Sequence, residues 1–125
     1  MENIINEKFT YAVVGASNDE EKYGFKVLKD LSDAQYKVIP INPKEDEIYN
    51  LKAYASLSAV VDKIDVLVCV VPPKITYDIV KEAYNLGIDK IWMQPGSESD
   101  SAIEFCDKNN MQCIHHMCIM VRRIS

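Results

Sequence analysis

The chain has 125 residues, and 48% of them are hydrophobic. A chain of this length can bury the core of one domain without stabilising disulfides or metals, but it is too short for two domains. Its 19 Asp and Glu residues outnumber its 14 Lys and Arg residues, and the net charge of −5 argues against general binding to nucleic acid or to a membrane surface. We therefore expect a single domain over residues 1–125, with no nucleic-acid or membrane partner. A small anionic ligand remains compatible with this charge, because a few lysines can cluster locally.

The N-terminal segment and the cysteines predict a cytoplasmic protein. Residues 1–8 are polar and do not resemble a signal peptide, and no apolar run approaches the length of a membrane span. The four cysteines form no C-x-x-C pair, and we expect them to be free, mostly buried thiols of a reducing compartment: Cys69, Cys106, Cys113 and Cys118.

Five short runs rich in β-branched residues predict strands, at residues 9–14, 36–41, 64–71, 90–93 and 111–114. Nearly continuous apolar runs of this kind are typical of parallel sheets that are buried on both faces. Four segments between these runs predict helices, at residues 22–32, 56–61, 74–85 and 101–108. Ser56 is a suitable N-cap for the second helix, and the third carries an apolar stripe of Ile75, Ile79, Ala83 and Leu86.

Alternation of strands and helices with short loops indicates βαβ crossovers. We predict an α/β fold, a Rossmann-like, doubly wound, parallel five-stranded sheet with the strand order 3-2-1-4-5. Ligands of such sheets bind outside the carboxyl ends of the strands, so the loops that follow the strands form the candidate site.

The loop after the first strand has the character of a phosphate-binding turn. Gly15 allows a sharp turn, Ala16 and Ser17 are small, and the helix that follows presents free N–H groups and a positive dipole end. The G-x-G-x-x-G pattern is absent, since only Gly15 and Gly24 remain. Taken alone, the loop is equally compatible with an ordinary tight turn between a strand and a helix.

The loop after the second strand lacks the carboxylate with which NAD sites usually bind the ribose. Asn42 can bind a ribose or a phosphate, and Lys44 favours an additional phosphate on the ribose, as in NADP and coenzyme A (CoA). Lys44 is alternatively a solvated lysine in an acidic loop. After the third strand, Pro72 and Pro73 form a stiff apolar wall that either flanks an adenine or only ends the strand.

These loops together resemble the CoA-binding domain family, which includes small stand-alone proteins and the first domain of succinyl-CoA synthetase α subunits and of ADP-forming acyl-CoA synthetases. Six stretches carry the resemblance in order, at residues 14–17, 22–24, 38–44, 70–73, 92–97 and 118–120. The resemblance implies CoA as the ligand, held through its ADP half.

The resemblance also implies a role for each matching residue. Residues Gly15, Ala16 and Ser17 would hold the pyrophosphate, with Lys22 reaching the same phosphates and Gly24 in the matching stretch beside it. Asn42 and Lys44 would bind the ribose and its 3′-phosphate. Near the adenine or the entrance for pantetheine would lie Pro72, Pro73, Gln94 and Gly96.

We expect a non-catalytic protein that binds CoA or acyl-CoA, because the sequence shows no pairing of a nucleophile with a base. His115 and His116 do not match the phosphorylated histidine of the larger enzymes, and adjacent strand residues point to opposite faces, so we expect no metal site there. Cys118 could pair with the CoA thiol. Alternatives that remain open are an NADP-linked oxidoreductase, a nucleotide-sensing regulator and a detached subunit of an acyl-CoA ligase; a homodimer is also compatible with the sequence.

Overall fold

The runs of β-branched residues form a parallel sheet in the computed structural model, which describes residues 4–124. The strands are β1 (Thr10–Val14), β2 (Lys37–Ile41), β5 (Val66–Cys69), β6 (Lys90–Met93) and β7 (Gln112–Ile114). Every residue of β1 and β5 is buried, as expected for central strands that are covered on both faces. Part of the segment 1–8, for which we expect no signal peptide, lies outside the described residues.

The strands lie in the order β2-β1-β5-β6-β7, and the Rossmann-like α/β prediction is confirmed. Outside β2, Tyr54 forms an isolated parallel bridge with Ile41. If the bridge at Tyr54 is counted as strand 3, then β5 is strand 4, β6 is strand 5, and the order from the outer edge reads 3-2-1-4-5, with β7 as a sixth strand. The run at residues 64–71 forms β5, which pairs with β1 in the middle of the sheet and does not lie at its outer edge.

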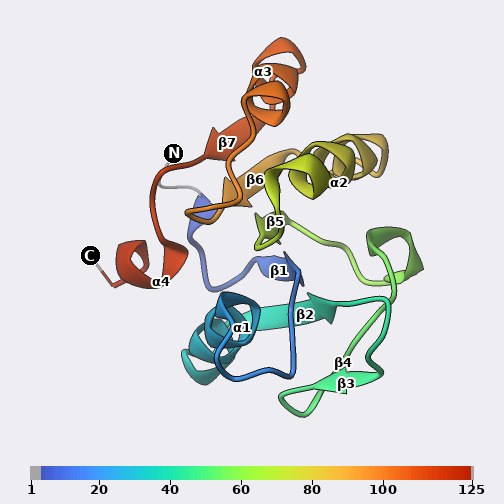
Figure 1. Ribbon diagram of the computed structural model, residues 1–125, viewed down its shortest axis with the longest axis vertical. Helices are drawn as coiled ribbons and strands as arrows, with labels where there is room; N and C mark the ends of the chain where they lie inside the picture. The colour runs from blue at the N-terminus through green and yellow to red at the C-terminus, as the bar shows by residue number, and fades with distance from the viewer. Residues whose placement is uncertain (1–3, 125) are drawn as a thin grey trace.

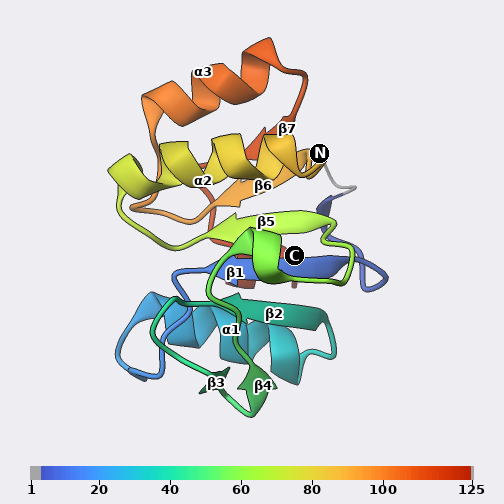
Figure 2. The ribbon, with the colours of Figure 1, turned by 90° about the vertical axis from the view of Figure 1, so that its right-hand side faces the viewer.

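Helices cover both faces of the sheet (Figures 1 and 2). On one face lie α1 (Tyr23–Asp33) and the short α4 (Ile119–Arg122), and on the other lie α2 (Pro73–Asn85), α3 (Asp100–Lys108) and the 3₁₀ helix η2 (Leu57–Ala59). A two-stranded antiparallel hairpin, β3 (Glu47–Ile48) and β4 (Leu51–Lys52), lies below β2 in Figure 2. Among residues 4–124, no helix is both long enough and apolar enough to span a bilayer.

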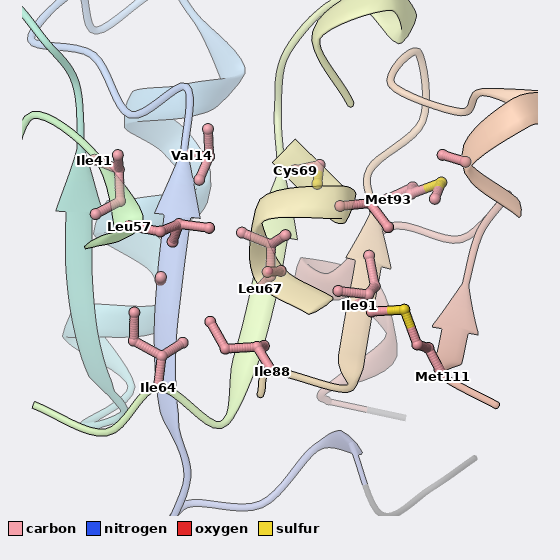
Figure 3. Close-up of a cluster of buried hydrophobic side chains, with 14 of the residues drawn as sticks. Val14, Ile41, Leu57, Ile64, Leu67, Cys69, Ile88, Ile91, Met93 and Met111 are labelled. Atoms are coloured by element: carbon pink, nitrogen blue, oxygen red, sulfur yellow. The ribbon is translucent and has the colours of Figure 1, made fainter. Parts of the chain in front are cut away.

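Two apolar cores result, one on each face. Beneath α2 and α3, Leu67 and Ile91 of the sheet are fully buried (Figure 3). On the opposite face Trp92 packs with Leu28 of α1 and Ile119 of α4. Full burial of each large apolar side chain contributes about 1.5–3 kcal/mol, so the two cores hold the helices rigidly against the sheet.

The strands begin and end within two residues of their predicted limits, but two helices differ from expectation. The predicted helix at 56–61 is only the single turn of η2, and Ser56 precedes it without a capping hydrogen bond from its side chain. On α2 the buried face is formed by Thr76, Val80 and Ala83, while two members of the predicted stripe, Ile75 and Leu86, are 44% and 47% exposed. The hairpin β3–β4 and the helix α4 were not predicted.

Candidate functional site

A cleft of about 530 Å³ opens at the carboxyl ends of β1, β2 and β5. Its walls come from the loops after these strands, from the first turn of α1, from residues 55–57 around η2 and from one side of α2. This is the location at which doubly wound sheets bind their ligands. Of the predicted site residues, seven line the cleft: Gly15, Ala16, Ser17, Lys22, Gly24, Asn42 and Pro72.

The turn at residues 15–17 depends on the glycine at its start. Gly15 has a φ of +98°, and a β-carbon at this position would collide with the carbonyl oxygen of Val70. The Gly15 amide donates to the carbonyl of Ile41 at 3.3 Å, and the Ser17 hydroxyl oxygen accepts from the Asp19 amide at 3.0 Å. The chain therefore turns sharply at the end of β1 and passes close to the ends of both neighbouring strands.

Gly24 allows α1 to pack directly on this turn. A β-carbon on Gly24 would overlap the carbonyl oxygen of Gly15, so any larger residue would push the helix away. Lys22 occupies the N-cap position, is exposed and makes no capping hydrogen bond from its side chain. The N-terminus of α1 thus faces the cleft with its positive dipole end and a lysine, a combination that favours anions.

Asn42 joins the loops after β1 and β2. Its Nδ2 donates to the carbonyl of Ala16 at 2.9 Å, and its Oδ1 accepts from the backbone amide of Lys44 at 2.7 Å. Each group of the side chain keeps capacity for one further hydrogen bond. Lys44 is exposed and does not line the cleft, but it directly follows Pro43, which does.

The second proline and the residues after β6 lie outside the cleft. Pro73 is the first residue of α2 and lines a separate hollow of about 540 Å³ with Tyr77 and residues 98–101. Gly96 is exposed and its amide donates to Glu98 Oε1 at 2.8 Å.

The carboxamide of Gln94, which is 2% exposed, is used to anchor α4. Its Oε1 accepts from the Ile119 amide at 2.7 Å, and its Nε2 donates to Cys118 Sγ at 3.3 Å.

A match to known proteins agrees with this geometry. The sequence model of the CoA binding domain matches residues 9–123, nearly the whole chain. The chain belongs to the CoA-binding domain family.

Its relatives include parts of much larger enzymes. The chain is 42% identical over 77 residues to an ADP-forming acetate–CoA ligase of Methanocaldococcus jannaschii, and the match covers 62% of this chain and 11% of that protein. It is 30% identical over 119 residues to the α subunit of the ADP-forming acetate–CoA ligase II of Pyrococcus furiosus, covering 86% of this chain and 26% of that protein. The chain therefore spans about a quarter or less of the length of these ligases.

A small protein of known structure matches over nearly its full length. It is a conserved hypothetical protein of Pyrococcus furiosus, 42% identical, with a TM-score of 0.87 over 91% of this chain and 98% of the other.

The apolar half of the cleft in this CoA-binding domain was not predicted from the sequence. Leu57 of η2 faces it from one side, and Ile75, Ile79 and Glu82 of α2 line the other side. The spacing of the three α2 residues by four and three positions places them on one face of the helix. This spacing is visible in the sequence, but isoleucines at helical spacing predict core residues, which most apolar residues in that pattern are.

The histidine pair is arranged differently from expectation. His116 has a φ of +62°, and the Nδ1 atoms of His115 and His116 approach to 2.7 Å, so the two rings do not point to opposite faces. The prediction failed because β7 ends at Ile114 and strand alternation stops there. Within residues 4–124, no group of three or more His, Cys, Asp or Glu side chains is placed to hold a metal.

The four cysteines are free. Burial raises the pKa of the Cys69 thiol, and a hydrogen bond with Cys106, together with burial, raises the pKa of Cys113. Both thiols therefore stay protonated at neutral pH and are poor nucleophiles.

Proposed function

We propose that this chain binds CoA, free or as an acyl thioester, through the ADP half of the ligand in the cleft at the ends of β1, β2 and β5. The observation that carries this proposal is the close packing of Gly24 on Gly15, which brings the N-terminus of α1 against the turn that ends β1. Membership of the CoA-binding domain family supports the choice of ligand.

The pyrophosphate would lie over the turn at residues 15–17. Backbone amides at a sharp turn and at a helix N-terminus are suited to phosphate oxygens, and Lys22 adds a positive charge at the same end of the cleft. Ser17 supplies a small side chain with a hydroxyl, so the backbone remains accessible to the ligand.

The ribose and its 3′-phosphate would lie over the loop after β2. Asn42 has one donor and one acceptor position left after it has joined the two loops, which suits a ribose hydroxyl. The exposed Lys44 at the rim would pair with the 3′-phosphate.

The adenine would occupy the apolar half of the cleft, between Leu57 on one side and Pro72 with Ile79 on the other. The pantetheine arm would leave in the opposite direction, past Pro73 and the exposed Gly96. Gln94 would act on that path indirectly, because it holds the start of α4 in place.

We further propose that the chain does not catalyse a reaction alone. Within the described residues, the cleft lining offers the hydroxyls of Ser17, Tyr23 and Ser56 and the carboxylate of Glu82, but no histidine or cysteine. Since the chain spans 26% of the related ligase α subunit from Pyrococcus furiosus, a role as a detached subunit of an acyl-CoA ligase is compatible with this proposal.

Ligand-dependent thermal stability tests the proposal. A ligand present at about a hundred times its dissociation constant stabilises a protein by about 2.7 kcal/mol, which gives a clear shift in melting temperature. We expect this shift with CoA and a clearly smaller one with NAD at the same concentration, because NAD lacks the 3′-phosphate. Equal shifts with both ligands, or no shift with CoA, would contradict the proposal.

A further inference from the structure

Glu82 is the acidic residue of the cleft. It lies on the face of α2 that also carries Ile75 and Ile79. Ser56, just before η2, and Leu57, its first residue, line the same cleft. Figure 2 shows η2 and α2 on the same face of the sheet. In the part of the chain that the structure describes, no hydrogen bond or ion pair involves its carboxylate.

The adjacent lysine does not neutralise this charge. Lys81 lies 3.9 Å from the carboxylate of Asp78 and 4.2 Å from the ring centre of Tyr77, so its ammonium group is used on another side of the helix. Glu82 therefore presents an acceptor without a donor to a cleft that is also lined by the turn at residues 15–17.

A carboxylate in a site for a ligand with three phosphate groups costs binding energy, because like charges repel. This cost is small only where the part of the ligand next to the carboxylate is uncharged and offers a hydrogen-bond donor. If the phosphates lie at the turn of residues 15–17 and over Asn42, the part of the ligand in the apolar half is the adenine, whose donor is its exocyclic amine.

We propose that Glu82 makes the site selective for adenine, by accepting a hydrogen bond from the 6-amino group while Leu57 and Ile79 enclose the ring. This assignment rests on the proposed function and adds to it the residue that recognises the base. It also gives the acidic side chain a role in this cleft: Glu82 belongs to α2, whereas Lys22 and the turn proposed for the phosphates belong to the start of α1 and the end of β1.

The test compares CoA with its purine analogue, in which hydrogen replaces the 6-amino group. Hydrogen bonds to a charged group are strong enough that the wild-type protein should bind CoA about tenfold more tightly than the analogue. Glu82→Met removes the acceptor, retains helix propensity and should bind the two ligands within about twofold of each other. Glu104→Met, on the exposed face of α3 away from the cleft, is the matched control and should keep the preference.

Titration calorimetry with both ligands and the three proteins separates the outcomes. A preference that is present in the wild type and in Glu104→Met but absent in Glu82→Met supports the assignment. CoA binding by the wild type without a preference, or a preference that survives in Glu82→Met, overturns the role of Glu82 and leaves the proposed function intact. Binding of neither ligand by the wild type overturns both.

Discussion

Replacing Gly24 by alanine tests the contact on which the proposed phosphate site depends. In an ordinary helix this change is favourable by about 0.5–1 kcal/mol. Here the new β-carbon would overlap the carbonyl oxygen of Gly15 and lie 3.3 Å from the Ala16 Cα, and both are backbone atoms that cannot rotate away. Forced overpacking costs about 1–3 kcal/mol, so after the gain in propensity we expect a net loss of about 1–2 kcal/mol.

The same displacement should weaken CoA binding by more than tenfold, because α1 moves away from the turn that it completes. Gly87→Ala is the matched control, since Gly87 has a φ of +83° but a β-carbon there would meet nothing within 4 Å. Its left-handed conformation should cost about 1–2 kcal/mol, and CoA affinity should not change.

Urea denaturation and calorimetric titration of both variants give the comparison. We predict similar losses of stability in the two variants and a loss of CoA affinity only in Gly24→Ala. A Gly24→Ala protein that is as stable as the wild type and binds CoA normally would refute it.

Three further predictions concern other parts of the chain. Lys44→Ala should weaken CoA binding about tenfold and leave dephospho-CoA binding unchanged, since hydrogen bonds to charged groups are worth about 1.5–3 kcal/mol and solvent reduces this one; equal effects on both ligands would exclude a role with the 3′-phosphate. Burial raises the pKa of Tyr11 to about 12, whereas in the unfolded chain it is about 10. The free energy of unfolding relative to Tyr11→Phe should therefore be constant below pH about 10 and fall by about 2.7 kcal/mol as the pH rises from about 10 through 12, as measured by denaturation across that range. The purified chain should show no acyl-CoA ligase or hydrolase activity in coupled assays, and turnover abolished by a point change in the cleft would contradict this.

The sheet was accessible from the sequence because its strands are short apolar runs buried on both faces. Thr10–Val14 and Val66–Cys69 carry this signal in every residue. The hairpin of β3 and β4 was not accessible, since two-residue strands such as Glu47–Ile48 are too short to show alternation. The four-residue helix Ile119–Arg122 is likewise shorter than the periodic pattern that identifies a helix.

The site was accessible where the backbone makes it and inaccessible where side chains from different elements meet. Gly15 and Gly24 were identified as residues of the turn and the helix start, and the structure shows that they pack on each other. The apolar half of the cleft depends on the rotation of α2, which turns Ile75 outward and Thr76 inward. Hydrophobic periodicity alone does not fix that rotation to within one residue, so Ile75, Ile79 and Glu82 were not recognised.

A crystal structure of this chain with CoA tests the central claim most directly. We predict the pyrophosphate over residues 15–17, the 3′-phosphate near Lys44 and the adenine between Leu57 and Ile79. CoA bound instead in the hollow lined by Pro73 and residues 98–101, or a cleft that remains empty at saturating CoA, would contradict the account.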